Sequence, residues 1–453
     1  MSATSLAHKT FHVITYGCQM NKHDSERIVG MLTSWGAEEV PTIEDAEIVV
    51  FMTCCVREAA DIRLKGQVAS LKNIPLPANS TLKKRIVAIG GCIGQRDREK
   101  LETELPHVDI VFGTFNLGDL PNLVNQIITE GGQRVSVLES AETFPTELPT
   151  KREHSWAAWV PISIGCNNFC TYCIVPYVRG REKSRTIEDI VLDVRNLIAD
   201  GVKEITLLGQ NVNSYGRDLY GSPRFAKLLN TIADLGIDRI RFATSHPKDL
   251  NDEVIRAFAE LPNVMPALHL PVQSGSNSIL KAMNRRYTRQ HYLEIVSKLR
   301  EARSDIALST DVIVGFPGET EADFKDTYSL IDEVGYNQVF TFIYSKREGT
   351  PAAKMVDSIP HEVIQSRFDS LVNLVQKRAY EMNQRYNNET VEVLFESLSK
   401  RNKSILTGKS PHNITVHVPL PDGKQLYDFE GKILPVNITE AKTWYLKGSF
   451  INE

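Results

Sequence analysis

Strands and helices alternate along most of this chain, and that alternation restricts the fold to a parallel α/β architecture. In the first part of the chain, apolar runs typical of strands lie at 11–16, 47–52, 85–90 and 108–112. Helix-spaced or helix-favouring stretches follow the first three of these runs, from about 25, 57 and 95. Strands that alternate with helices form parallel sheets. The sequence therefore predicts a doubly wound parallel domain over residues 10–132.

The alternation resumes after a stretch that is typical of a linker. Residues 139–154 are rich in Glu, Thr and Pro. Candidate strands then lie at 159–164, 204–208, 239–243, 266–270, 306–313 and 338–343. Helical stretches begin near 187, 224, 252, 276, 289 and 321. These six strand–helix units predict a partial (β/α)6 barrel over residues 152–382, with its functional groups at the carboxyl ends of the strands.

The last part of the chain has a different pattern. A long amphipathic helix is expected over 367–386, and short strands follow it at 390–395, 404–409, 415–418, 432–438 and 444–448. Strands at this spacing predict a small β-barrel, here over residues 383–450.

Three of the chain's seven cysteines have the spacing C-x3-C-x2-C, at Cys166, Cys170 and Cys173. They lie on the loop after the strand at 159–164. Three thiolates on one tight loop suit an iron–sulfur cube that keeps one iron open. Structural zinc usually takes a fourth protein ligand and favours C-x2-C pairs. The spacing therefore predicts an iron–sulfur site, with a zinc knuckle or buried structural cysteines as the alternatives.

Three further cysteines each follow a strand of the first domain: Cys18, Cys54 and Cys92. The carboxyl ends of parallel strands share one edge of a sheet, so these thiols should converge on a second three-cysteine site. The alternative is three buried structural cysteines. Cys55 adjoins Cys54, and adjacent side chains on an extended strand point in opposite directions. We therefore expect Cys55 to face away.

These motifs resemble a known enzyme family. C-x3-C-x2-C with Tyr172 before its last cysteine resembles the signature of radical S-adenosylmethionine (SAM) enzymes. The motifs at 15–21, 53–58 and 91–96 resemble those of the methylthiotransferases, and Tyr-Gly-Cys-Gln-Met-Asn resembles the members that act on isopentenyladenosine in tRNA. The chain departs from the family at Cys55, where serine is common. The terminal barrel resembles a TRAM domain, an OB-like RNA-binding module.

The resemblance, which covers nearly the whole chain, implies two [4Fe-4S] clusters. One would bind SAM and be held by Cys166, Cys170 and Cys173; an auxiliary cluster would be held by Cys18, Cys54 and Cys92. The implied SAM contacts are Tyr172, Gly209, Gln210, Asn211, Gln273, Ser274, Asp311 and Val312. The implied substrate contacts are Arg179, Arg185, Lys400, Arg401 and Lys403.

The implied activity is methylthiolation of carbon 2 of N6-isopentenyladenosine at tRNA position 37, next to the anticodon. SAM would serve as both methyl donor and radical source. Two other substrates stay open, namely threonylcarbamoyladenosine tRNA and a ribosomal-protein aspartate. A different class also stays open, an RNA-binding protein with structural iron–sulfur clusters.

The composition of the chain limits its expected partners and its expected location in the cell. The chain has 453 residues and a net charge of −4, so contacts with nucleic acid must come from local basic patches. It has no apolar run that could span a bilayer and no signal-peptide core near Met1, so we expect a cytoplasmic protein without membrane contact. Seven cysteines there favour metal chemistry over disulfides. We expect a monomer. Its expected partners are tRNA, an electron donor such as flavodoxin or ferredoxin, and proteins that supply sulfur and clusters.

Overall fold

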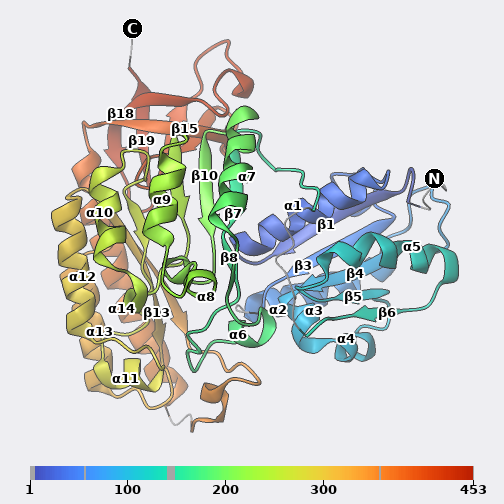
Figure 1. The fold of residues 1–453 in the computed structure, drawn as a ribbon, viewed down its shortest axis with the longest axis horizontal. Helices are drawn as coiled ribbons and strands as arrows, with labels where there is room; N and C mark the ends of the chain where they lie inside the picture. Colours follow the sequence, from blue (N-terminus) through green and yellow to red (C-terminus); the bar gives the residue numbers. More distant parts are fainter. Residues whose placement is uncertain (1–5, 56–57, 140–147, 357–358, 452–453) are drawn as a thin grey trace. The chain divides into compact units, whose positions relative to one another are not determined.

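Figure 1 shows the computed structural model, which describes residues 6–55, 58–139, 148–356 and 359–451. The chain divides into two compact units. The first comprises Met1–His154, Ser163–Phe169 and Cys173–Ser184, and the second comprises Ser155–Ile162, Cys170–Tyr172 and Arg185–Glu453. Half of the predicted linker, 140–147, lies outside the described residues. No described helix is long and apolar enough to cross a membrane.

The first unit is built on a six-stranded parallel sheet with the order β2-β1-β3-β4-β5-β6. Its strands are β1 Thr10–Tyr16, β2 Glu38–Glu39, β3 Ile48–Thr53, β4 Ile86–Gly91, β5 Ile110–Phe112 and β6 Arg134–Ser136. Its helices are α1 Gln19–Ser34, α2 Glu58–Ser70, α3 Cys92–Asp97, α4 Glu99–Glu104 and α5 Leu120–Glu130. The predicted doubly wound parallel fold is confirmed.

Alternation along β3 explains why this sheet is covered on both faces. Val50 and Met52 point into one apolar core, whereas Val49 and Phe51 point into a second core. Every residue of β3 is buried, as expected for a central parallel strand.

The second unit contains six parallel strands in chain order, arranged as two three-stranded sheets. The strands are β7 Ala157–Pro161, β10 Glu204–Leu208 and β11 Arg239–Phe242 in one sheet, and β12 Ala267–His269, β13 Ala307–Val314 and β14 Gln338–Ile343 in the other. A parallel bridge between Ile240 and Val264 links β11 to the segment before β12. The predicted partial barrel is thus confirmed as an open arrangement.

Helices follow these strands, and several begin at a side-chain cap. The helices are α7 Ile187–Ala199, α8 Arg217–Tyr220, α9 Phe225–Ala233, α10 Asp252–Glu260, α11 Asn277–Ala282, α12 Arg289–Ala302, α13 Glu321–Val334 and α14 His361–Asn383. The capping oxygens, each accepting from a backbone N–H in the first turn, belong to Thr186, Asn251, Ser276, Thr288 and Thr320. At these five helices, the cap marks where the preceding loop ends.

The C-terminal strands close into a five-stranded barrel with the order β15-β16-β17-β19-β18. They are β15 Thr390–Leu398, β16 Ile405–Lys409, β17 Thr415–Pro419, β18 Ile433–Ala441 and β19 Tyr445–Phe450. Gly408 permits the close packing of β16 on β15, because a Cβ there would lie 2.4 Å from the Leu394 carbonyl oxygen. The predicted small barrel is confirmed.

A buried carboxyl in the second unit gives a testable pH dependence. Glu319 accepts hydrogen bonds from Arg367 Nη1 at 2.9 Å and from the Gly315 N–H at 3.3 Å. Burial raises its pKa from 4.5 to about 7. The folded state therefore binds this proton more tightly than the unfolded state does. The free energy of unfolding should fall, on the order of 1–3 kcal/mol, as pH rises from about 4.5 to about 7.

Urea unfolding across this pH range checks the sign. Glu319→Gln should remove this part of the pH dependence, because the amide cannot ionise. Glu321→Gln is the matched control, since Glu321 also pairs with Arg367 but its side chain is 60% exposed. An equal slope in Glu319→Gln and the unmodified chain would contradict the assignment.

Candidate metal centres

Parallel pairing brings three loops of the first unit to one edge of its sheet. Thr53 at the end of β3 pairs with Tyr16 of β1 and with Gly91 of β4. The residues one or two places beyond these three are Cys54, Cys18 and Cys92. The backbone therefore brings these three loops together, as predicted. The direction of each cysteine side chain is a separate question.

Glycines allow the loops to come this close. A Cβ on Gly17 would lie 2.9 Å from Cys54 Cβ, and a Cβ on Gly91, whose φ is +83°, would lie 2.7 Å from the Thr53 carbonyl oxygen. The Asn21 amide donates to that same carbonyl at 2.8 Å. Cys18 Sγ donates to the Asn21 side-chain oxygen at 3.2 Å. Asn21 thus ties the first loop to the second.

The thiols at this edge meet in pairs. A hydrogen bond from Cys54 lowers the pKa of Cys18 to about 5. Burial acts in the opposite direction, whereas the charge of Arg179 lowers this pKa further. A hydrogen bond from Cys55 lowers the pKa of Cys92 to about 6, again with help from Arg179. Thiolate is the form that ligates iron, so this donor set fits a cluster chemically. Among the described residues, no group of three or more His, Cys, Asp or Glu side chains has the arrangement of a metal site.

The expectation that Cys55 faces away is wrong. Cys55 is fully buried and shares an apolar core with Cys92. Its hydrogen bond to Cys92, together with its burial, raises the pKa of Cys55 well above its ordinary value. Alternation itself holds, because Cys55 lies in the same core as Val49 and Phe51. The expectation fails because Cys92 lies in that core as well.

Arg179 belongs to this thiol site. It follows the short helix α6 Val175–Val178, which Thr114 anchors by donating to the Val178 carbonyl oxygen at 2.8 Å. The Arg179 side chain is 7% exposed and pairs with Asp24 at 3.0 Å. The charges of Cys92 and Asp24 raise the pKa of this guanidinium despite its burial. A buried guanidinium that pairs with Asp24 does not fit the predicted substrate contact.

The ends of the C-x3-C-x2-C loop pack with the first unit. The Cys166 N–H donates to the Gly180 carbonyl oxygen at 3.1 Å. Gly165, with φ +74°, allows this approach, because a Cβ there would lie 2.2 Å from the Arg181 carbonyl oxygen. Arg181 also places its guanidinium 4.3 Å from the centre of the Phe169 ring. Cys166 and Cys173 stay partly exposed.

The middle of the loop packs with the second unit. Cys170 is buried, and its sulfur accepts from Arg285 Nη1 at 3.6 Å. The Thr171 N–H donates to the Met283 carbonyl oxygen at 3.1 Å. Tyr172 packs against the small apolar cluster that contains Met283 and Phe316. The loop is therefore held by backbone contacts as well as by its side chains.

Several predicted SAM contacts of the second unit lie together, where the segment after β12 runs beside β13. Gln273, in the left-handed region with φ +69°, forms a parallel bridge with Val312 and donates its N–H to the Asp311 carbonyl oxygen at 2.8 Å. Asp311 Oδ2 lies 3.5 Å from His269 Nε2. Ser274 Oγ lies 3.1 Å from Thr327 Oγ1.

The ends of β10 and β11 carry unsatisfied polar atoms. Gly209, Gln210 and Asn211 directly follow β10, and the Asn211 amide donates to Asp249 Oδ2 at 2.7 Å. Four buried atoms here have no hydrogen-bond partner in the described part of the chain: Asn211 Oδ1, Asn213 Nδ2, Ser245 Oγ and His246 Nε2. Leaving such atoms unpaired is costly, so this group of polar atoms fits a polar ligand such as SAM.

Comparison with known proteins decides the family. Profiles described as Radical SAM superfamily, Uncharacterized protein family UPF0004 and TRAM domain match residues 160–331, 10–113 and 384–451. The chain is 47% identical, over 97% of its length and 92% of the relative's, to a tRNA-2-methylthio-N(6)-dimethylallyladenosine synthase of Thermoanaerobacter sp. strain X514. The chain belongs to this synthase family. A synthase of Carboxydothermus hydrogenoformans is 44% identical over 98% of this chain and 100% of its own.

Two solved structures have a fold similar to that of this chain. A radical SAM methyltransferase of Kitasatospora setae, TsrM, matches with a TM-score of 0.55 at 12% identity, over 76% of this chain and 77% of its own. The radical SAM enzyme OxsB matches with a TM-score of 0.51 at 14% identity, over 83% of this chain and 58% of its own. At this identity the likeness supports the α/β architecture alone.

The remaining predicted substrate contacts are in two different environments, one exposed and one buried. Lys400, Arg401 and Lys403 are exposed at the turn between β15 and β16. Arg185 is 3% exposed and donates to Asp193 Oδ2 at 2.6 Å and to the Pro161 carbonyl oxygen at 3.2 Å. This burial does not fit the predicted role of Arg185 as an RNA contact.

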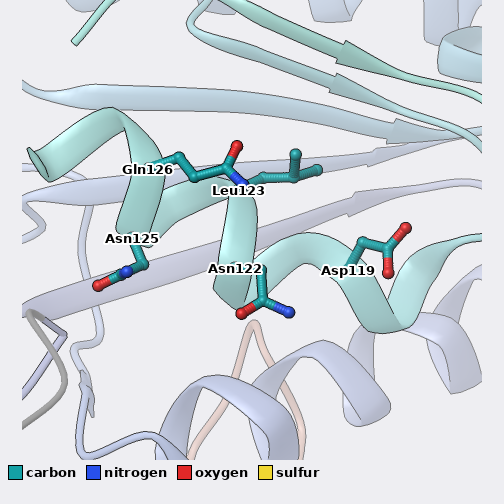
Figure 2. Close-up of a pocket in the computed structure, with 5 residues that line it drawn as sticks. All are labelled: Asp119, Asn122, Leu123, Asn125 and Gln126. Carbon is teal, nitrogen blue, oxygen red and sulfur yellow. The ribbon is translucent and has the colours of Figure 1, made fainter. Parts of the chain in front are cut away.

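The first unit has a pocket of about 350 Å³ at α5 (Figure 2). Its lining is Asp119, Asn122, Leu123, Asn125 and Gln126. Its lining contains no cysteine and none of the predicted site residues.

Proposed function

We propose that this chain methylthiolates carbon 2 of N6-isopentenyladenosine (N6-dimethylallyladenosine) in tRNA, next to the anticodon. The observation that carries the proposal is the 47% identity, across 97% of the chain, to a tRNA-2-methylthio-N(6)-dimethylallyladenosine synthase. The C–H bond at carbon 2 of adenine is not acidic, so general bases cannot open it and radical chemistry is required. This requirement agrees with the match of residues 160–331 to the radical SAM superfamily.

Two [4Fe-4S] clusters complete the proposed site. Cys166, Cys170 and Cys173 would hold the SAM-binding cluster, and Cys18, Cys54 and Cys92 would hold the auxiliary cluster. When bound, the first supplies the electron for reductive cleavage of SAM and the second supplies the sulfur. SAM serves as radical source and as methyl donor.

The proposed SAM site lies at the carboxyl ends of the strands in the second unit. The unsatisfied polar atoms after β10 and β11 support this location, because SAM carries an amino group, a carboxylate and hydroxyls. Tyr172, Gly209, Gln210, Ser274, Asp311 and the backbone around Gln273 and Val312 would complete the contacts.

The proposed RNA contacts are on the C-terminal barrel. Lys400, Arg401 and Lys403 are exposed cations suited to phosphates. Tyr427 and Trp444 are 76% and 48% exposed, so their rings are available for stacking on bases. The target adenosine sits in an anticodon loop, where single-stranded bases turn outward readily.

The setting of the enzyme is proposed along with its reaction. The domain limits are 10–132, 152–382 and 383–450, and the enzyme works in the cytoplasm as a monomer. It needs a low-potential electron donor such as flavodoxin or ferredoxin, and proteins that supply clusters and sulfur.

An anaerobic assay tests substrate and reaction together. The reconstituted protein is given SAM, reductant, sulfide and one of three tRNAs, which carry isopentenyladenosine, threonylcarbamoyladenosine or unmodified adenosine. Nucleoside mass spectrometry should find the 2-methylthio product with the first tRNA alone. Product with the second tRNA alone would show that threonylcarbamoyladenosine, and not isopentenyladenosine, is the substrate. Failure to release 5′-deoxyadenosine with any tRNA would favour an RNA-binding protein with structural clusters.

A further inference from the structure

Arg285 lies in the loop between α11 and α12 with its guanidinium buried beside Cys170. The residue is 4% exposed. Its Nη1 donates to Cys170 Sγ at 3.6 Å, its Nε donates to the Tyr287 hydroxyl at 3.0 Å, and its Nη2 donates to the Pro271 carbonyl oxygen. Each nitrogen of the guanidinium therefore has its own acceptor.

Tyr287 holds this arrangement rigid. Its hydroxyl donates to the Val272 carbonyl oxygen at 2.7 Å while it accepts from Arg285. The Arg285 guanidinium also lies 5.2 Å from the centre of the Tyr287 ring. Pro271 and Val272 follow β12, so the guanidinium is fixed to the strand-end segment that leads to the predicted SAM contact Gln273.

The partners of Arg285 are unusual for a buried charge. A buried cation normally pairs with a carboxylate, since desolvation is otherwise costly. In the described residues, no carboxylate forms an ion pair with Arg285, and its acceptors are a thiol sulfur, a phenol and a carbonyl oxygen. A negative charge at Cys170 would complete the pairing.

We infer that Arg285 is a positioning residue for Cys170 and that its charge favours the reduced state of the cluster held there. The inference rests on the proposed function, because Cys170 must be a cluster ligand. Reduction adds one negative charge to a cluster, and a nearby buried cation stabilises the more negative state. Hydrogen bonds to ligand sulfur and local charge are among the factors that set cluster potentials.

A purely structural role for Arg285 would give a different result. Loss of a loop anchor would lower the melting temperature and the iron content together. It would leave unchanged the potential of those molecules that fold and bind iron. The reduction potential therefore separates the two roles.

The test uses full-length chains that also carry Cys18→Ala, Cys54→Ala and Cys92→Ala, so that one cluster signal remains. In this background, Arg285→Met and Arg285→Lys are compared with Arg286→Met, which removes the adjacent, exposed arginine. Iron and sulfide content, thermal unfolding and redox titration followed by electron paramagnetic resonance are measured. We expect Arg285→Met to have a more negative potential than Arg286→Met, and Arg285→Lys to lie between them.

Equal potentials in all three iron-loaded chains would overturn the inference while leaving the proposed function intact. If Arg285→Met fails to fold, Arg285→Gln decides, because it also removes the charge: a shift toward negative potential supports the inference, and no shift overturns it. Absence of iron from the Arg286→Met control would instead count against the proposed cluster site itself.

Discussion

Cys170→Ala should abolish both SAM cleavage and methylthio product, whereas Cys92→Ala should abolish the product alone. Cys170 belongs to the proposed SAM-binding set, so its loss removes the electron source for cleavage. Cys92 belongs to the proposed auxiliary set, so its loss removes the sulfur source and leaves cleavage in place. Parallel measurement of 5′-deoxyadenosine and of the 2-methylthio nucleoside gives both readouts from one reaction.

Cys55→Ser is the matched cysteine variant for this experiment. It replaces the fully buried thiol beside Cys92 with a hydroxyl, which is also a hydrogen-bond donor. We expect it to retain both activities. Loss of cleavage in Cys92→Ala, or retention of product there, would contradict the proposed division between the two cysteine sets.

Arg239→Met should produce the largest loss of stability that we expect from a single side chain. The residue is 2% exposed and donates to the Lys409 and Glu392 carbonyl oxygens, both at 3.0 Å. Its neighbour Arg241 pairs with Glu204 at 2.9 Å, so a charged cluster on β10 and β11 meets the C-terminal barrel. Removing Arg239 leaves buried acceptors without donors, at a cost of about 3–5 kcal/mol.

Urea unfolding of the full chain, followed by tryptophan fluorescence, measures this loss. Arg256→Met is the control, because Arg256 is an exposed residue of α10. It should change stability by less than about 0.5 kcal/mol. A similar small change in Arg239→Met would show that the carbonyl groups are satisfied in another way.

The long elements could be predicted because their hydrophobic patterns are strong. The apolar runs that became β3 and β13 and the helix periodicity of α12 all lie within a few residues of their predicted bounds. The short edge strands β2 and β6 escaped prediction, since two or three residues cannot show alternation. α1 begins at Gln19 rather than near 25, because its first turn follows Cys18 directly and carries few apolar residues.

The parts of the candidate site that depend on spacing in the sequence could be predicted. The parts that depend on tertiary packing could not. The cysteines follow strands, so their loops could be placed from the sequence. The burial of Arg179, the contact of Arg185 with Pro161 and the contact between Arg285 and Cys170 depend on residues far apart in the chain. The pair Arg285-Arg286 reads as a charged loop in the sequence, and no local pattern marks which arginine is buried.

We propose that this chain builds two separate three-cysteine cluster sites. Iron and sulfide content, with Mössbauer spectroscopy, should be measured on the unmodified chain and on two triple alanine variants. One variant removes Cys18, Cys54 and Cys92, and the other removes Cys166, Cys170 and Cys173. Two clusters in the unmodified chain and one in each variant is the predicted result. A single cluster in the unmodified chain, lost in both variants, would contradict the claim.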